Sequence, residues 1–459
     1  MNVVPFVHEG LGNSSYLVEL SDGRAALLDP DRLVARYLQA AEARGWQITS
    51  VFETHLHADF VSGAGEVAAA TASRIFVAAA AECRFQHTAV THGEKIRLAG
   101  VEVEAVGSPG HTPEHVSYVF RSGGRPPALF SGGSLIVGGA ARTDLIAKEM
   151  TETLTRAQYR TLKTAFERLP DETPLFPTHG GGSFCSAGDG SERTSTLGRE
   201  RQRNPMLRFQ GEEEFVRWFP STFPAVPDYF SRMRAINQAG PRLRRDIAAP
   251  PPLRLDEFEA ASRAALIVDV RPKEAYSAAH LPGSLHNAFR DSYAIWLGWL
   301  APAGTPLLFV LGDVPLEAVV CESMLVGYER FAGWLAGGLE SWVAANKPIA
   351  SAQLVDAAAA RQALANGATA VDVREAVELE SGHIQGAIHI PLGTLQRELE
   401  QVPRDRPVMT YCAHGERAST AVSILERAGF GSLLNLNGGI EAWREAGFAV
   451  AAAERAALS

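Results

Sequence analysis

Two segments in the second half of the chain carry the same pattern of residues, and this internal repeat restricts the folds that the chain can adopt. The stretch LIVDVRPKEAYSAAHLPGSLHNAF, with Asp269 and His280, matches AVDVREAVELESGHIQGAIHIPL, with Asp372 and His383. Further on, PLLFVL matches PVMTYC and AGGLESW matches LNGGIEAW at one constant offset. Each copy follows the order strand, helix, strand, helix, which predicts two small α/β domains, each with a mainly parallel sheet.

The length of the chain predicts further structure before this repeat. With 459 residues the chain is too long for one core, and about three domains of ordinary size are expected. A proline cluster and a basic patch interrupt the alternation of strands and helices, which is typical of a linker. We therefore predict an N-terminal domain at residues 1–240 and a linker at residues 241–253. The two repeated domains are expected at residues 254–350 and 352–459.

The composition favours a globular protein that acts on small molecules. Hydrophobic residues make up 46% of the chain, and no apolar run reaches the roughly 18 residues of a membrane span. A net charge of -9 argues against nucleic acid or an anionic membrane as partner. The first residues lack the pattern of a secretory signal, so a cytoplasmic location is expected. Four cysteines are too few for a disulfide framework in so long a chain: Cys83, Cys185, Cys321 and Cys412.

Cys412 is the strongest candidate nucleophile. It ends an apolar run in PVMTYCAHGERAS, with Gly415 and Arg417 after it. A strand that delivers a cysteine to a tight turn before a helix directs backbone N–H groups at the sulfur and favours the thiolate. A buried cysteine that only packs as an apolar side chain is the alternative, which the Gly and Arg at anion-binding positions disfavour. In the first copy Leu311 takes the place of Cys412 and Leu316 that of Arg417, so only the second copy has a nucleophile.

The second copy resembles the rhodanese family of sulfurtransferases over its whole length. The matching motifs are Asp372-Val373-Arg374, Gly382 to Ala387, Cys412 to Arg417, and Gly438 to Trp443. The resemblance implies that the cysteine carries sulfane sulfur as a persulfide, and that a loop of six residues suits sulfur rather than phosphate-like oxyanions. It makes Cys412 and Arg417 catalytic and implies substrate binding by Ala413, His414, Gly415 and Glu416. The first copy resembles a rhodanese without its nucleophile, so a docking or spacer role is expected.

A second group of candidate residues lies in the N-terminal domain. His55, His57 and Asp59 follow the apolar stretch ITSVF, in a loop at the end of a predicted strand. This spacing directs two imidazoles and a carboxylate toward one point, as a metal site requires. His111 follows in SPGHTPEH and His179 in LFPTHGGG. A chance cluster of surface histidines is the alternative, and the order of the motifs argues against it.

These motifs resemble the metallo-β-lactamase fold. The expected fold class is therefore an α/β multidomain chain, with a metallo-β-lactamase αββα sandwich followed by two rhodanese-like α/β domains. Hydrolases of the glyoxalase II type in this fold use two metals and need a histidine where Phe60 stands. Persulfide dioxygenases of the fold bind one iron through counterparts of His55 and His111 and through an aspartate, and Gly133 stands at the aspartate position.

The missing carboxylate leaves the ligand set open. We expect His57 to complete a three-imidazole metal site with His55 and His111. Asp59 and His179 are second choices, as partners that orient the imidazoles. A further alternative is a degenerate site without metal.

The order of the domains resembles the persulfide dioxygenase and rhodanese fusion proteins of bacterial sulfide detoxification. The resemblance implies one Fe(II) per chain and oxidation by O2 of a low-molecular-weight persulfide, such as glutathione persulfide, to sulfite. It also implies transfer of sulfane sulfur between persulfide, sulfite and thiosulfate, and a homo-oligomer. A zinc thioester hydrolase fused to a sulfurtransferase and a sulfur carrier or sensor with a degenerate N-terminal site are the alternatives. Cys185 is either a sulfur relay near the metal site or an ordinary thiol.

Overall fold

The chain forms two compact units. The computed structural model describes residues 1–180, 183–187 and 192–452. One unit comprises residues 1–247 and 321–327, and the other comprises residues 248–320 and 328–459. Within the described part of the chain, no helix combines the length and the apolar character needed to cross a membrane.

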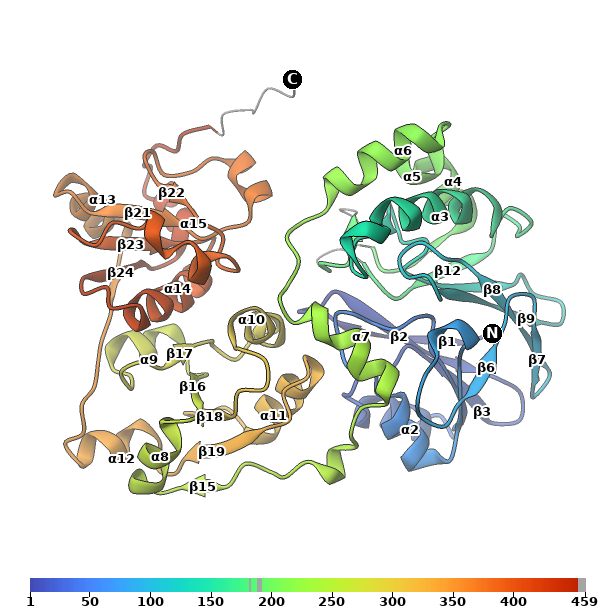
Figure 1. Ribbon diagram of the computed structural model, residues 1–459, viewed down its shortest axis with the longest axis horizontal. Helices are drawn as coiled ribbons and strands as arrows, with labels where there is room; N and C mark the ends of the chain where they lie inside the picture. The colour runs from blue at the N-terminus through green and yellow to red at the C-terminus, as the bar shows by residue number, and fades with distance from the viewer. Residues whose placement is uncertain (181–182, 188–191, 453–459) are drawn as a thin grey trace. The chain divides into compact units, whose positions relative to one another are not determined.

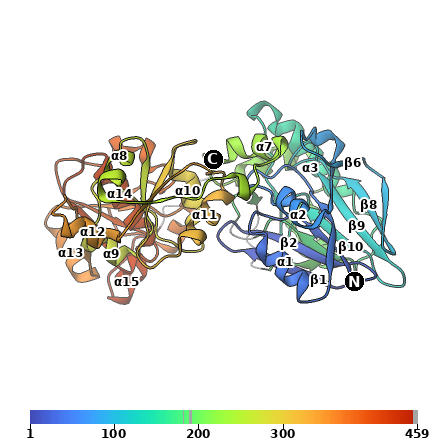
Figure 2. The same cartoon turned by 90° about the horizontal axis from the view of Figure 1, so that it is seen from below.

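Two six-stranded sheets form the centre of the first unit. The first has the order β1 (Val3–His8), β2 (Asn13–Glu19), β3 (Arg24–Leu28), β4 (Gln47–Phe52), β5 (Arg74–Ala78), β6 (Thr88–Val90). The second has the order β14 (Ser195–Thr196), β12 (Pro174–Pro177), β10 (Ala128–Gly132), β9 (Val116–Ser122), β8 (Val101–Gly107), β7 (Lys95–Leu98). A short ribbon pairs β11 (Ala140–Ala141) with β13 (Ser186–Ala187). Figure 2 shows β8, β9 and β10 running side by side.

Helices cover the outer faces of both sheets. They are α1 (Ala35–Glu42), α2 (Ala64–Thr71), α3 (Thr151–Thr164), α4 (Leu197–Arg203), α5 (Pro205–Arg208), α6 (Glu212–Trp218) and α7 (Phe230–Ala239). Figure 1 shows α3 and α6 on the outer side of the second sheet and α2 on the outer side of the first. The unit is therefore an αββα sandwich, as the sequence predicts.

Alternating side chains of the strands fill the space between the two sheets. Along β9, Tyr118 and Phe120 enter the inner core, whereas Val119 packs in the cluster that α3 and α6 complete. Across the sandwich, the rings of Phe52 and Tyr118 lie 4.8 Å apart, and Phe52 also stacks on Phe76 at 4.7 Å. This aromatic layer joins the two sheets directly beside the loops that follow β4 and precede β9.

Those loops meet at one edge of the sandwich. Because β10 runs parallel to β12 and antiparallel to β9, the ends of β10 and β12 lie beside the start of β9. The Val116 N–H donates to the Thr54 carbonyl at 2.8 Å, which joins the start of β9 to the residue that follows β4. The candidate metal ligands lie in loops at this edge.

The second unit repeats one sheet twice. The first five-stranded sheet has the order β15 (Pro252–Leu253), β19 (Phe331–Leu335), β18 (Leu307–Val310), β16 (Leu266–Asp269), β17 (Leu285–His286). The second has the order β20 (Gln353–Val355), β24 (Leu433–Leu436), β23 (Val408–Tyr411), β21 (Thr369–Asp372), β22 (Ile388–His389). All pairings in both sheets are parallel, as predicted. The helices are α8 (Leu255–Ser262), α9 (Lys273–Ala278), α10 (Tyr293–Leu300), α11 (Leu316–Leu325), α12 (Gly338–Ala344), α13 (Ala357–Ala365), α14 (Glu416–Arg427) and α15 (Gly439–Glu445).

The repeated Asp-Val-Arg motif has the same structural role in both sheets. The guanidinium of Arg271 pairs with Asp269, and that of Arg374 pairs with Asp372, each with a shortest N to O distance of 2.6 Å. Both pairs are buried, at the end of β16 and of β21. The repeated Asp-Val-Arg motif therefore stabilises the fold in both copies, whereas the loops after β18 and β23 differ at the position of the cysteine.

Candidate metal centre and cysteine loop

Three buried imidazoles converge at the edge of the sandwich. His55, His111 and His179 are at most 1% exposed, and one ligand atom of each lies within 4.8 Å of the other two. The ring centroids of His55 and His111 lie 4.8 Å apart, and those of His111 and His179 lie 5.2 Å apart. The Nε2 atoms of His55 and His179 are separated by only 3.2 Å.

The hydrogen bonds of His111 and His179 define their tautomers. The Nδ1 atom of His111 lies 2.6 Å from the carbonyl oxygen of Arg142, and Nδ1 of His179 lies 3.2 Å from Oδ2 of Asp59. A carbonyl or a carboxylate oxygen only accepts, so Nδ1 carries the proton in both rings. The Nε2 atom of each ring therefore presents a lone pair to the centre of the group.

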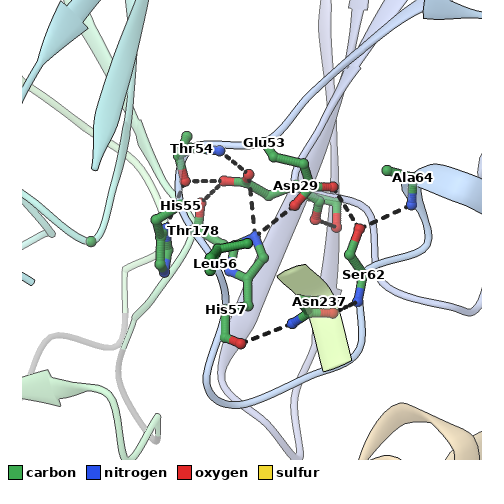
Figure 3. Close-up of polar contacts among 12 residues, drawn as sticks. Asp29, Glu53, Thr54, His55, Leu56, His57, Ser62, Ala64, Thr178 and Asn237 are labelled. Carbon is green, nitrogen blue, oxygen red and sulfur yellow. Dashed lines mark hydrogen bonds and ion pairs between the residues drawn. The ribbon is translucent and has the colours of Figure 1, made fainter. Parts of the chain in front are cut away.

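His55 is oriented through a hydroxyl group. Its Nδ1 atom lies 2.9 Å from Oγ1 of Thr54, and this hydroxyl donates to Oδ2 of Asp29 at 2.8 Å (Figure 3). Because the hydroxyl proton is already committed to the carboxylate, the ring of His55 donates through Nδ1. Its Nε2 atom then carries an unprotonated lone pair as well.

This arrangement fits a divalent metal ion. The Nε2 atoms of His55 and His179 lie 3.2 Å apart, and Nε2 of His111 is buried beside them without a hydrogen-bond partner among the described residues, so three ring nitrogens converge where a cation would bind. Burial and the neighbouring imidazoles lower the pKa of His55, and burial foremost lowers the pKa of His111 to about 3, so both rings are neutral. Neutral imidazoles whose other nitrogen donates to a carbonyl or carboxylate are the usual histidine ligands of zinc and iron.

The Nε2 atom of His57 faces a pair of carboxylates, although its ring lies beside His55. Its Nε2 atom lies 3.2 Å from Oε2 of Glu53 and 3.3 Å from Oδ1 of Asp29 (Figure 3). Burial opposes protonation, but Asp29 and Glu53 raise the pKa of His57 to about 10. From α7, the amide of Asn237 donates to the carbonyl of His57 at 2.8 Å and fixes the loop. The side chain is a buried cation that two carboxylates hold in place.

The ligand set therefore differs from the one expected from the sequence. The sequence predicts His57 as the third imidazole, and the structure brings His179 to His55 and His111 instead. The atoms of His57, Asp59 and His179 also satisfy the same distance limit, as do those of Asp29, Glu53 and His57. In those groups Nε2 of His57 lies against the carboxylates of Asp29 and Glu53, so the set of His55, His111 and His179 fits a metal best.

Gly133 occupies the position of the missing aspartate. Neighbouring side chains fill the space that a side chain at this position would need. A β-carbon at Gly133 would lie 2.6 Å from Cδ2 of His111 and 2.9 Å from the β-carbon of Ala141. The Gly133 N–H donates to Nε2 of His115 at 2.9 Å, and the ring of His115 stacks on His55 at 4.9 Å. Sequence reasoning did not single out His115, although a second histidine four residues after His111 was the available signal.

Asp144 and Cys185 flank the metal centre without joining it. The guanidinium of Arg142 makes two hydrogen bonds to Asp144, at 2.7 Å and 2.9 Å, so this carboxylate stabilises the loop that carries it. The Arg142 N–H donates to the carbonyl of Cys185 at 2.9 Å. Cys185 is fully buried, and burial raises the pKa of its thiol well above the ordinary value. This environment favours the thiol over the thiolate that a sulfur relay requires.

The loop after β23 holds Cys412 as the sequence predicts. Cys412 is 2% exposed, and the Gly415 N–H donates to its Sγ atom at 3.1 Å. Gly415 has a φ of 92° and precedes the first residue of α14, Glu416. A β-carbon at Gly415 would meet the carbonyl oxygen of Leu436 at 3.0 Å. The turn thus requires glycine and directs a backbone donor and the start of a helix at the sulfur.

The other loop residues differ in exposure and in partners. His414 is exposed, whereas Ala413, Glu416 and Arg417 are half-buried. Two nitrogens of Arg417 bond to the carboxylate of Glu378, at 2.6 Å and 2.7 Å. Glu378 lies outside the loop, and no signal in the sequence pointed to it.

In the first repeat, Leu311 follows β18 as Cys412 follows β23, and it is buried. The loop of the first repeat therefore has the same place in the fold and no sulfur.

Comparisons with known proteins agree with both halves of this description. The model of the Metallo-beta-lactamase superfamily matches residues 8–179, and that of the Rhodanese-like domain matches residues 254–345 and 356–446. A metallo-beta-lactamase from Staphylococcus aureus has a similar structure, with a TM-score of 0.65 and 30% identity, covering 73% of this chain and 98% of that one.

Two curated relatives each match one part of the chain. A sulfurtransferase of Allochromatium vinosum is 37% identical over 84 residues, which is 18% of this chain and 78% of that protein. A hydroxyacylglutathione hydrolase of Polaromonas is 34% identical over 172 residues, which is 36% of this chain. The chain spans 62% of the length of that hydrolase.

Proposed function

The chain belongs to the metallo-β-lactamase superfamily and also carries two rhodanese-like domains, and from this basis we propose that it is a bifunctional enzyme of sulfur metabolism. The second rhodanese-like domain transfers sulfane sulfur through Cys412. The N-terminal domain oxidises a low-molecular-weight persulfide, such as glutathione persulfide, to sulfite with O2. Sulfite is then an acceptor that the rhodanese-like domain converts to thiosulfate, so the product of one domain is a substrate of the other.

The geometry around Cys412 is the observation that carries the sulfurtransferase activity. The Gly415 N–H lies 3.1 Å from Sγ, and Arg417 follows in the first turn of α14. The Cys412 thiolate attacks the outer sulfur of thiosulfate, the S–S bond breaks, and sulfite leaves with the bonding electron pair. An acceptor thiolate or cyanide then attacks the outer sulfur of the Cys412 persulfide and restores the Cys412 thiolate. The loop N–H and the guanidinium stabilise the negative charge in both steps.

The N-terminal domain supports the oxidation through its three converging imidazoles. His55, His111 and His179 would hold one Fe(II), and the metal would supply the site at which O2 is activated beside the persulfide sulfur. Overall, a persulfide, O2 and water give a thiol, sulfite and two protons. Asp59 and the carbonyl of Arg142 keep the protons of His179 and His111 on Nδ1, so Nε2 stays available. Burial of all three rings excludes bulk water from the ligand atoms.

A thioester hydrolase with zinc is the second candidate, because hydroxyacylglutathione hydrolases are among the relatives of the N-terminal domain. Two residues argue against it. Phe60 is buried and stacks on His57 at 4.2 Å, where hydrolases of this type need another metal-binding histidine. Gly133 has no side chain and therefore no carboxylate that could bridge two metal ions. The convergence of three lone pairs argues in turn against a degenerate domain that binds nothing.

Reconstitution with Fe(II) under anaerobic conditions tests the proposal. We expect one iron per chain by metal analysis, and oxygen uptake in an oxygen electrode when glutathione persulfide is added. His111→Ala is the control, because it removes one imidazole from the centre. Oxygen uptake equal to that of His111→Ala would exclude the dioxygenase, and bound zinc with thioester cleavage would establish the hydrolase in its place.

A further inference from the structure

The helix that starts at the cysteine loop rests on the first rhodanese-like domain along its length. The His286 N–H donates to Oγ of Ser423 at 3.0 Å, and Nε2 of His280 lies 2.8 Å from the carboxylate of Glu426. The first domain therefore contacts α14 itself, and its loops lie close to the Cys412 site.

Lys273 of the first domain reaches the loop directly. Its Nζ atom bonds to Oε1 of Glu416 at 2.5 Å, and a β-carbon at Gly415 would lie 3.6 Å from its Cε atom. The side chain of Lys273 is only 12% exposed, so water screens this ion pair weakly. Glu416 alone would place a negative charge beside a loop that must hold a thiolate and an anionic substrate. Lys273 neutralises this charge.

Arg290 of the first domain is a second cation at the site. It follows His286, which is anchored on α14, and it interacts electrostatically with Glu416, Cys412 and Arg417. Among the residues that the structure describes, the Arg290 guanidinium has no hydrogen-bond or ion-pair partner. Arg417 differs in this respect, because Glu378 occupies two of its nitrogens. Arg290 is therefore a cation near Cys412 that no described side chain occupies, and it belongs to the domain without a nucleophile.

We propose that Arg290 and Lys273 of the first rhodanese-like domain determine the specificity of the Cys412 site for anionic sulfur donors. Arg290 binds the sulfonate end of a donor such as thiosulfate, and Lys273 neutralises Glu416. The inference rests on the proposed sulfur transfer at Cys412. It gives the first domain a direct part in the reaction in place of the docking or spacer role predicted from the sequence.

The kinetics of thiosulfate turnover in the full chain, with cyanide as acceptor, test this role. We expect Arg290→Gln to raise the KM for thiosulfate about tenfold or more, because a charge-assisted hydrogen bond is lost, and to change kcat less. Arg290→Lys should recover part of the loss. Lys347→Met is the matched control, since Lys347 pairs with Glu259 at 2.6 Å within the first domain, and its KM should equal that of the unmodified chain. Equal KM values for Arg290→Gln and Lys347→Met would overturn the role of Arg290.

A charge exchange tests the pair of Lys273 and Glu416. Lys273→Glu alone should raise the KM for thiosulfate more than Arg290→Gln does, because two carboxylates then face each other. The double variant Lys273→Glu with Glu416→Lys should return the KM to within a few fold of the original value. If the double variant is as impaired as the single one, Lys273 does not act through Glu416.

Alkylation of Cys412 measures the same cationic site without sulfur transfer. Iodoacetate is an anion and iodoacetamide is neutral, so the ratio of their rates at Cys412, followed by mass spectrometry of its peptide, reports the local charge. Arg290→Gln should lower this ratio several-fold, and Lys347→Met should leave it unchanged. An unchanged ratio in Arg290→Gln contradicts the inference. A lowered ratio in a chain that transfers no sulfur would leave the cationic site in place and refute only the proposed function.

Discussion

The Nε2 atoms of His55 and His179 lie 3.2 Å apart, although the two residues follow strands of different sheets. The Nδ1 atom of each ring faces a partner of its own, Oγ1 of Thr54 at 2.9 Å in one case and Oδ2 of Asp59 at 3.2 Å in the other. Two ring nitrogens at this distance share either a proton or a cation, and the buried Nε2 atom of His111 beside them makes the group a candidate cation site. This relationship places His179 in the ligand set and leads to the first prediction.

His179→Ala should lose most of its bound metal. Two imidazoles hold a divalent ion much more weakly than three, so we expect metal affinity to fall at least about tenfold. Metal analysis after dialysis against a weak chelator measures the effect. Full metal occupancy in this variant would mean that His179 only orients other groups.

His57→Gln should keep the three imidazoles and lose stability. The variant removes the buried cation between Asp29 and Glu53, and an uncompensated buried charge costs about 3–5 kcal/mol. Urea unfolding of the N-terminal unit, followed by tryptophan fluorescence, should show the decrease in the free energy of unfolding. His92→Gln, at an exposed position, is the control. A loss of metal with unchanged stability would instead support the ligand role predicted from the sequence.

Gly133→Asp should not restore a carboxylate ligand. The new β-carbon would lie 2.6 Å from Cδ2 of His111, so His111 or the backbone must move. We expect lower metal occupancy and a lower melting temperature, since overpacking of a buried site costs about 1–3 kcal/mol. Tighter metal binding by Gly133→Asp would show that the site adapts to a carboxylate ligand at this position.

Cys412→Ser should abolish sulfur transfer from thiosulfate and leave persulfide-dependent oxygen uptake intact. A serine hydroxyl cannot carry sulfane sulfur, and Cys412 lies outside the unit that holds the three imidazoles. Parallel assays on one preparation of the variant separate the two activities. If oxygen uptake also disappears while the circular dichroism spectrum is unchanged, the two domains do not divide the chemistry as proposed.

Glu378→Gln should lower the stability of the chain near neutral pH, because it removes the ion pair with Arg417. Burial raises the pKa of Glu378, but Arg417 prevails and holds it below the ordinary value of 4.5. The pair therefore stabilises the fold fully above about pH 4.5, and this contribution is lost as the pH falls through the lowered pKa. Unfolding experiments should show a stability difference between the original chain and Glu378→Gln that is constant near neutral pH and shrinks in acid. A difference that does not change with pH would mean that the ion pair is not its source.

The sequence predicts the fold and the cysteine loop well because both depend on residues that are close in the chain. The repeated pattern contains complete strands and helices, and Cys412, Gly415 and the start of α14 are consecutive. The metal ligands depend on contacts between distant segments. Asp29 follows β3 and pairs with His57, while Asp59 orients His179 from far along the chain. Spacing within the motif around His55 contains no information about these partners.

The carboxylate of Asp29 joins three parts of the sandwich at once. It accepts hydrogen bonds from Thr54 after β4 and from Thr178 after β12, and it pairs with His57. Thr54 follows a strand of the first sheet and Thr178 follows a strand of the second. These hydrogen bonds therefore form only after the two sheets have packed against each other. A partly folded chain would therefore lack a preformed chelate, and metal capture becomes a late step that marks the completed domain.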